Sequence, residues 1–351
     1  MNILIAVLIF SILVLFHEFG HFLFARLCGV TVVEFSLGMG PRLISHVSKK
    51  SRIRYSLKAL PFGGSCQMQG EDEADEAEGS FGRAKVWQRF LIVAAGPVFN
   101  FLLAFVFSVF LIAGAGYDPP VVLDVTEDFP AERAGIKPGD TITRLGNSPV
   151  FLYRDITAFT LFHHDRMVSG EKLKISWKHE GRKHSAYIVP EKDESGRYLI
   201  GISGTSMYRL PGGPLSTVKY AVIETGYWVR TTVESLAMVL KGGVTLDDVS
   251  GPVGIVKTIG DTYEESKNDG AYYVWLNMLQ ISILLSANLG VMNLLPVPAL
   301  DGGRLLFLLL EGIRRRKIDP KVEAAVNNAG FMLLMGLIAV IMVHDTGKLI
   351  G

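Results

Sequence analysis

The stretch "VLFHEFGHFL", residues 14–23, places two histidines and a glutamate in the middle of an apolar N-terminal run. In a helix, residues four apart lie on one face, so the imidazoles of His17 and His21 can hold one metal ion. Glu18 lies beside them, where its carboxylate can take a proton from metal-bound water. Charged groups inside hydrocarbon cost roughly 2.5 kcal/mol or more each, which demands a paired or coordinated state. The pattern therefore predicts a Zn²⁺ site inside a membrane.

Composition supports a membrane protein, because 49% of the 351 residues are hydrophobic, more than soluble domains usually contain. The net charge of +1 gives no sign of a nucleic-acid partner. The two cysteines, Cys28 and Cys66, are too few for a disulfide framework. No basic segment precedes the first apolar run and no small-residue cleavage site follows it, so we expect this run to be retained.

Four apolar runs approach or exceed the roughly 20 residues that a helix needs to cross a bilayer. They cover about 3–25, 90–115, 272–295 and 324–343. We therefore expect a polytopic α-helical membrane protein with an inserted β-rich domain.

Lysine and arginine set the expected orientation, since short cytoplasmic loops are rich in both. Basic residues gather between the first two spans and again in "RRRK", residues 314–317. Both chain ends and the region 116–271 are then extracytoplasmic, in a multi-pass protein of the inner (plasma) membrane. The two histidines lie toward its cytoplasmic side.

Four parts follow along the chain. We expect an N-terminal membrane part (1–115), an extracytoplasmic β-rich domain (116–207), an amphipathic helix with a connecting segment (208–271) and a C-terminal membrane part (272–351). Short alternating runs predict the β-rich domain, with one helix at 152–163. Helical spacing over 215–241 predicts an amphipathic helix that lies on the membrane or packs against the spans. The acidic run "EDEADEAE", residues 71–78, is expected to be a solvated loop.

A catalytic zinc usually has three protein ligands, so a third is needed. Asp301 follows Pro296 and Pro298 near the inner end of the third span, at the depth of the histidines. It could instead only cap the following helix, and both roles can coexist. Most other candidates fall in the external region or on the wrong side; they are Glu34, Asp118, His163, His164, His179, His184, Glu311 and His344. Topology therefore favours Asp301.

Over nearly its whole length the chain resembles the site-2 protease family of intramembrane zinc metalloproteases, especially the bacterial regulator-of-sigma-E type. The zinc motif "HEFGHF" (17–22) and the second signature "NLLPVPALDGG" (293–303) carry the resemblance. Three further stretches are similar to parts of the family. "RYSLKALPFGGSCQMQGE" (54–71) resembles its membrane-associated β-hairpin, and "AAGPVFNFLLA" (94–104) resembles its second span. "FPAERAGIKPGDTITRLGN" (129–147) resembles the core of its PDZ domain. Only one PDZ domain fits here, where enterobacterial relatives have two.

This resemblance implies a Zn²⁺-dependent endopeptidase with His17, His21 and Asp301 as ligands and Glu18 as the catalytic residue. It would cleave membrane proteins in or near their transmembrane segments during regulated intramembrane proteolysis. Anti-sigma factors and signal-peptide remnants are examples of such substrates. They would already have been cut by another protease, and the PDZ domain would bind peptide or protein ends.

A substrate helix must unwind before its peptide groups become accessible, and an edge strand can replace the lost hydrogen bonds. We expect a hairpin over residues 55–68, with its turn at residues 61–64 including Gly63 and Gly64, to do this. Asn288 and Asn293, which we expect close to one face of the third span, would hold the unwound backbone. Interhelical hydrogen bonding explains both asparagines nearly as well. We expect Asn100, in the second span, to be a packing residue.

Two other classes of function remain open at this stage. A non-catalytic PDZ scaffold would have a degenerate metal site, whereas all four site residues are present. A metal transporter would spread its ligands along a path, whereas these converge on one depth.

Overall fold

The computed structural model describes residues 2–71, 77–205, 208–243 and 250–350, so part of the acidic run lies outside the described residues. The chain divides into two compact units. The helical unit comprises Met1–Ser108 and Gly242–Gly351, and the β-rich unit comprises Val109–Lys241.

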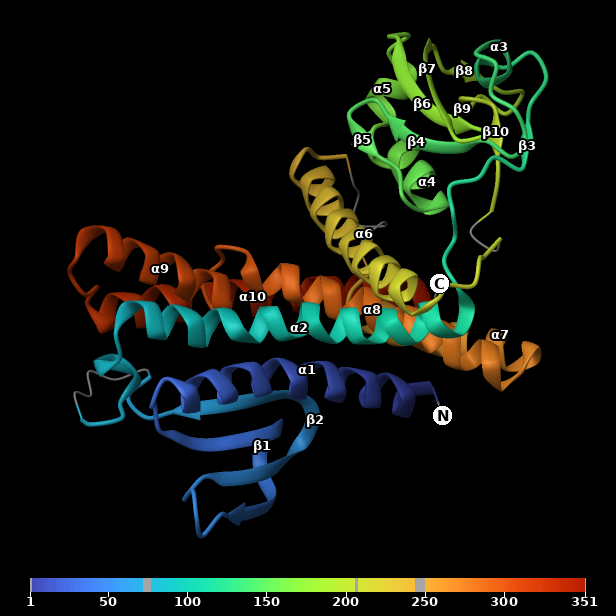
Figure 1. The fold of residues 1–351 in the computed structure, drawn as a ribbon. Helices are drawn as coiled ribbons and strands as arrows, with labels where there is room; N and C mark the ends of the chain where they lie inside the picture. Colours follow the sequence, from blue (N-terminus) through green and yellow to red (C-terminus); the bar gives the residue numbers. More distant parts are fainter. Residues whose placement is uncertain (1, 72–76, 206–207, 244–249, 351) are drawn as a thin grey trace. The chain divides into compact units, whose positions relative to one another are not determined.

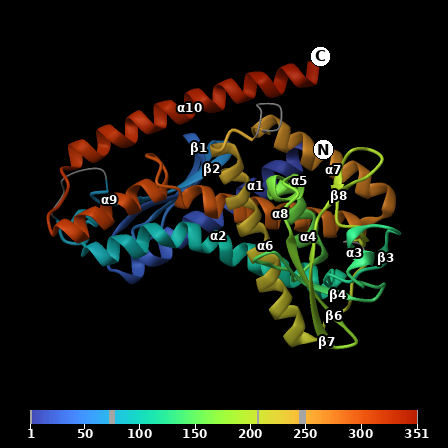
Figure 2. The same cartoon turned by 90° about the horizontal axis from the view of Figure 1, so that it is seen from above.

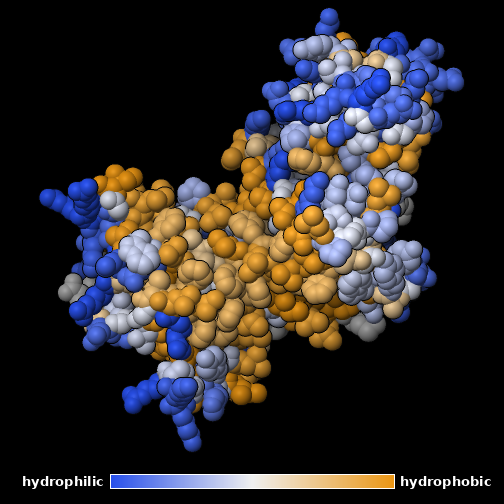
Figure 3. Space-filling view, in the orientation of Figure 1, coloured by the Kyte–Doolittle hydropathy of each residue, from blue (hydrophilic) through white to orange (hydrophobic). Residues whose placement is uncertain are grey.

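Four long apolar helices confirm the predicted membrane spans (Figure 1). They are α1 (Asn2–Leu27), α2 (Val86–Ala115), α8 (Ala271–Leu294) and α10 (Pro320–Ile350). Their outward faces form much of the hydrophobic surface in Figure 3. Two shorter helices, α7 (Pro252–Asp269) and α9 (Asp301–Arg314), complete the helical unit, and α7 was not anticipated as a separate helix.

Small residues let the spans approach one another closely. A Cβ on Gly20 of α1 would lie 2.5 Å from the Ala95 carbonyl oxygen of α2, and one on Gly290 of α8 would lie 2.6 Å from the Phe101 ring. Helix α1 also packs against α7 and α8. By contrast, α10 runs along the edge of this unit and contacts α7, and none of its apolar window is buried by other parts of the described chain (Figure 2).

Helix α1 ends in a Schellman motif, because Gly29 takes a left-handed conformation with φ of 78°. The amide of Val30 then donates to the Ala25 carbonyl at 2.8 Å. This reversal leads into a sheet of two long bent strands, β1 (Val32–Val47) and β2 (Arg54–Met68), which contacts α1.

The register of this sheet differs from the predicted hairpin. Residues 34–37 of β1 lie between residues 54–57 and 64–67 of β2, so the two arms of β2 pair with β1 and not with each other. The prediction of a hairpin with a turn at residues 61–64 was wrong, because β1 inserts between the two arms. Residues 64–67 and 44–47 therefore form the two edges of the sheet.

The β-rich unit contains a four-stranded sheet in the order β5-β4-β6-β7. These strands are β4 (Thr141–Leu145), β5 (Ser148–Pro149), β6 (Leu173–His179) and β7 (Arg182–Ile188). Four further strands have two residues each: β3 (Asp124–Val125), β8 (Glu191–Lys192), β9 (Tyr198–Leu199) and β10 (Ile202–Ser203). The unit also contains two short helices, α3 (Pro130–Arg133) and α5 (His164–Val168). Helix α4 (Tyr153–Phe162) confirms the helix expected at 152–163.

Helix α6 (Pro214–Leu240) confirms the helix predicted over 215–241, but its observed packing partner is α4 of the β-rich unit, which was not expected. Their contact contains a buried charge cluster in which Arg154 of α4 binds Asp118 at 3.0 Å and also Glu224 of α6. Burial opposes the charge of the guanidinium, but the two carboxylates raise the pKa of Arg154, so it stays protonated.

Candidate metal centre and active site

Three predicted ligands from distant parts of the chain meet in the helical unit. The Nε2 atoms of His17 and His21 are 3.2 Å apart, and Asp301 Oδ2 lies 3.2 Å and 3.4 Å from them. Both imidazoles are 8% exposed. Among the described residues, these three form the only cluster of histidine, cysteine and carboxylate side chains with metal-binding spacing.

The spacing suits zinc. Bonds of 2.0–2.1 Å in a tetrahedron separate neighbouring ligand atoms by about 3.3 Å, close to the three observed separations. Asp301 Oδ2 is also buried and has no well-directed hydrogen bond within the described part of the chain. A cation between the three atoms would satisfy this oxygen, and a tetrahedron leaves a fourth position for water.

Hydrogen bonds to the far ring nitrogens orient both imidazoles. His21 Nδ1 donates to the Ile92 carbonyl of α2 at 2.9 Å, which leaves its Nε2 free for a metal. His17 Nδ1 lies 3.0 Å from the side-chain amide of Asn100, also on α2. The structure places Asn100 Nδ2 toward this nitrogen. A metal on Nε2 leaves the proton on Nδ1, so an amide flip that exchanges Oδ1 and Nδ2 would let Asn100 accept that proton. It would also give a partner to this buried oxygen, which is unpartnered among the described residues.

Asn100 was therefore wrongly expected to be only a packing residue. It is fully buried, and its side chain contacts a metal-ligand candidate. The signal that could have identified it is its position in α2, one helical turn after Gly96 and Pro97.

Gly96 provides the space that the imidazoles occupy. A Cβ at this position would lie 2.3 Å from His21 Nε2 and 2.8 Å from His17 Cε1. Pro97, one residue later, has no N–H and cannot close the regular bond to the carbonyl four residues earlier. Residues 92–100 of α2 thus combine room for two rings, at Gly96, with groups at Ile92 and Asn100 that orient them.

Asp301 is positioned by close backbone packing at the start of α9. Ala299 has a left-handed φ of 75°, and Gly302 and Gly303 follow the aspartate. Cβ atoms on these glycines would lie 2.1 Å from the Leu295 carbonyl oxygen and 2.5 Å from the Val297 carbonyl oxygen. Only glycine therefore lets the first turn of α9 reach this depth.

The alternative role of Asp301 as a helix cap is wrong. Leu300 occupies the N-cap position, Asp301 is the first helical residue, and no side-chain capping bond forms. The carboxylate instead faces the two imidazoles.

A cavity of about 780 Å³ opens onto this cluster. Glu18 lines the same cavity as the three ligand candidates, and its carboxylate faces the backbone of Cys66. Burial and the nearby Glu18 raise the pKa of the Cys66 thiol, which therefore stays protonated at neutral pH. Residues 63–68, including Gly63 and Gly64, form one wall, so an edge of the sheet borders the candidate metal site.

Asn288 and Asn293 of α8 differ in their position relative to the cavity. Asn293 lines the cavity, whereas Asn288 is not among its lining residues. The expectation of nearly one face was wrong, because five residues advance a helix by 500° and leave the side chains about 140° apart.

Several rival ligands have other partners. Glu34 is bound by Arg42 at 2.8 Å, Asp118 by Arg154 at 3.0 Å, and Glu311 by Arg89 at 2.5 Å. Charged partners thus account for these carboxylates without a metal.

The model of peptidase family M50 matches residues 5–337 of this chain. The chain belongs to peptidase family M50. Site-2 proteases belong to this family, so the family expected from the zinc motif is confirmed. The chain is accordingly a zinc-dependent intramembrane metalloendopeptidase.

Relatives match over almost their full length. A protein of Clostridium acetobutylicum is 36% identical and covers 98% of this chain and 97% of its own. The zinc metalloprotease RasP of Geobacillus kaustophilus is 30% identical and covers 99% of this chain and 98% of its own. The regulator of sigma-W protease RasP of Bacillus subtilis is 29% identical, with coverages of 98% and 97%.

Among solved structures, the PDZ domain of an SdrC-like protein from Listeria monocytogenes is similar to part of this M50 chain. It is 27% identical and covers 25% of this chain and 87% of its own, with a TM-score of 0.21. The PDZ domain expected from residues 129–147 stays a prediction.

Proposed function

We propose that His17, His21 and Asp301 hold the catalytic zinc and that Glu18 acts as the general acid and base. The observation that carries this assignment is the convergence of three ligand atoms within 3.4 Å of one another beside a carboxylate-lined cavity. When bound there, zinc supplies Lewis-acid polarisation of the scissile carbonyl and acidification of water. Glu18 accepts the proton from that water and delivers it to the leaving amine.

The sheet edge at residues 64–67 is proposed to bind the unwound substrate. Among the strands of the described residues its backbone pairs only with residues 34–37, and it lies along the cavity wall. A substrate strand added here would exchange backbone hydrogen bonds with β2 next to Glu18. The side-chain amide of Asn293, which also lines the cavity from α8, is proposed to hold the same backbone. A substrate-binding role for Asn288 stays a prediction.

The proposed substrates are membrane proteins already shortened by another protease. The Bacillus subtilis relative is named as a regulator of sigma-W protease, which supports anti-sigma factors as one class. Signal-peptide remnants are proposed as a second class from the resemblance alone. The PDZ domain would bind peptide ends, or exclude proteins with large ectodomains.

The proposed orientation in the inner membrane follows the distribution of basic residues. Both chain ends and the PDZ domain would be extracytoplasmic, and the zinc site would lie toward the cytoplasmic side.

The assignment of Glu18 is tested with Glu18→Gln in the full chain, reconstituted with a model transmembrane substrate. We expect zinc content to be retained and cleavage to fall at least about 10²–10⁴-fold, the usual contribution of acid–base catalysis. Cleavage at the wild-type rate by a zinc-loaded variant would reject this role. If the wild type moved zinc into vesicles and cleaved nothing, the result would support a transporter. If the wild type showed neither zinc flux nor cleavage, the result would support a scaffold.

The substrate edge is tested by photo-crosslinking in the Glu18→Gln background. A crosslinker at Ser65 should capture the substrate, whereas one at His46, on the opposite edge of the same sheet, should not. Equal capture at both positions would argue against strand addition at residues 64–67.

A further inference from the structure

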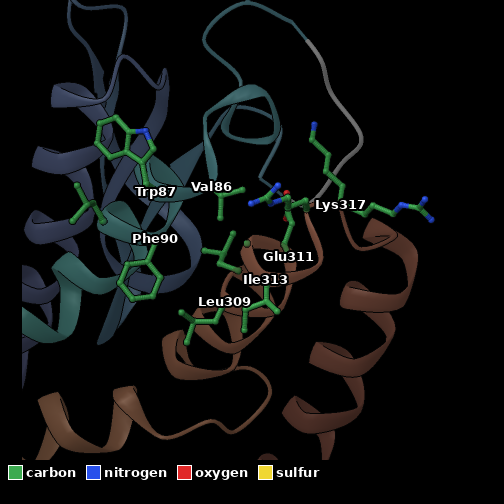
Figure 4. A pocket seen from close by; sticks show the side chains of 12 residues that line it. Val86, Trp87, Phe90, Leu309, Glu311, Ile313 and Lys317 are labelled. Atoms are coloured by element: carbon green, nitrogen blue, oxygen red, sulfur yellow. The ribbon is translucent and has the colours of Figure 1, made fainter.

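A second cavity, separate from the zinc site, lies between the first turns of α2 and the last turns of α9 (Figure 4). Its volume is about 880 Å³. Its wall is apolar and is formed by Val86, Trp87, Phe90, Leu91, Leu308, Leu309 and Ile313. Trp87 is 57% exposed and Ile313 79% exposed, so this groove opens to the surroundings of the helices.

Positive charge gathers at one end of the groove. Arg315, Arg316 and Lys317 line it and are exposed, and no carboxylate among the described residues lies within ion-pair distance of them. Lys317 Nζ donates to the carbonyl of Gly82 at 3.0 Å, which leaves its charge uncompensated.

The one acid on the groove wall does not offset this charge. Glu311 is buried against Arg89 at 2.5 Å, so the two charges neutralise each other. We call Arg315, Arg316 and Lys317 the basic rim.

The length and composition of α2 predict that the groove lies at the boundary of the hydrocarbon layer. The span of α2 begins at Val86, and tryptophan is typical of this boundary, as at Trp87. Arg315 follows α9 as its C-cap with a left-handed φ of 53°, a position where glycine is usual, and it places a cationic side chain at the rim.

We propose that this groove binds one anionic phospholipid, with its acyl chains on the apolar wall and its phosphate at the basic rim. Basic clusters beside membrane spans attract anionic headgroups, and an apolar wall fits the attached chains. A zwitterionic lipid matches the wall but has no net charge for the rim. The acidic run 71–78 matches the rim, but its only apolar residues are alanines, so it does not suit the wall.

The test uses the full-length protein in detergent, incubated with equal amounts of dioleoyl phosphatidylglycerol and dioleoyl phosphatidylcholine, with retained lipid counted by native mass spectrometry. The wild type should retain phosphatidylglycerol preferentially. Replacing Arg315, Arg316 and Lys317 with glutamine should reduce this preference by about fivefold for each charge removed. The matched control replaces Lys49, Lys50 and Arg52, an exposed basic turn in which Arg52 also has a positive φ of 54°. This control variant should still retain phosphatidylglycerol in preference to phosphatidylcholine.

Gly312→Leu tests the apolar wall without changing charge. A Cβ at Gly312 meets only Val86, at 3.8 Å, so the substitution fits locally, extends into the groove and favours the helix. Retention of phosphatidylglycerol should fall while the lipid-free melting temperature holds or rises.

Three results would overturn the proposal. They are equal retention of both lipids by the wild type, an unchanged preference after neutralising the rim, and an equal loss in the Lys49, Lys50 and Arg52 control. A Gly312→Leu protein that changes oligomeric state but keeps its lipid would instead identify a contact between two copies, and would also reject the lipid site.

Discussion

Gly96 shows how one missing side chain can determine a metal site. A methyl group at this position would overlap both imidazoles, since its nearest contacts would be 2.3 Å and 2.8 Å away. We expect Gly96→Ala to lower zinc affinity at least about 10–100-fold, as displaced orienting groups do at other metal sites. Zinc content after dialysis against a chelator measures this.

Gly336→Ala is the matched control for Gly96→Ala. Gly336 is also a helical glycine in a span, and a Cβ there meets nothing within 4 Å. Zinc retention equal to that of Gly336→Ala would show that the two histidines can move aside.

Asn100 gives a second test, which also distinguishes the tautomer of His17. If Asn100 Oδ1 accepts a proton from Nδ1, then Asn100→Asp keeps the acceptor and Asn100→Leu removes it. We expect the leucine variant to lose about 10–100-fold in zinc affinity and the aspartate variant to stay near wild type. Competition with a zinc-chelating dye measures both. Equal losses in the two variants would mean that the asparagine donates rather than accepts.

At the scale of elements, the bent β1–β2 sheet is held by one buried acid. Glu34 is 2% exposed, and Arg42 and Ser56 hydrogen-bond to its carboxylate. The bonds from Arg42 and Ser56 lower the pKa of Glu34 to about 2 against the cost of burial. The sheet thus depends on this carboxylate remaining ionised.

The sign of the pH effect follows from this lowered pKa. An unfolded glutamate titrates near pH 4.3, so the stabilisation is fully present above that pH and is lost as pH falls toward 2. We expect hydrogen-exchange protection of the β1–β2 amides to fall between about pH 4.5 and pH 2. Glu34→Gln should lack this component, and an identical pH profile in the variant would show that other groups control the sheet.

Helix α9 links two features at its opposite ends. Its first residue is Asp301, placed by Gly302 and Gly303 against backbone carbonyls, and its last turn forms the groove with the basic rim. The buried pair of Arg89 and Glu311 fastens this helix to α2. One short helix thus presents both a metal-ligand candidate and the proposed lipid site.

At the scale of the whole molecule, the two units should respond separately to mutation. Arg154→Met leaves the carboxylates of Asp118 and Glu224, both fully buried, without their cation. We expect the β-rich unit to lose about 3–5 kcal/mol of stability, because an unpaired buried charge is costly. Zinc content should be unchanged, because His17, His21 and Asp301 all belong to the helical unit.

Limited proteolysis of the β-rich unit and zinc analysis of the same sample measure the two effects of Arg154→Met. Arg133→Met is the matched control, because it breaks an exposed pair with Glu191 and should change little. Adding Asp118→Asn and Glu224→Gln to Arg154→Met should recover part of the stability. Zinc loss in Arg154→Met alone would show that the units are coupled.

Much of the architecture was predictable, because the relevant signals are local. Length and apolarity predicted the four spans, and a spacing of four residues predicted that His17 and His21 share a helix face. Asp301 could be nominated because two prolines end the third span at a matching depth. The hairpin over 55–68 was predicted wrongly, because strand pairing depends on segments far apart in the chain.

By itself, the sequence determined the membrane-spanning helices, the paired histidines with their glutamate, and the family to which these motifs belong. Only the tertiary structure decided that Asn100 holds His17, that Asn293 and not Asn288 reaches the cavity, and that residues 64–67 form its free edge. Helical periodicity and hydrophobicity are written into neighbouring residues, so they can be read along the chain. Which side chains meet depends on how closely separate backbones approach, and here glycines such as Gly96 and Gly302 set those distances.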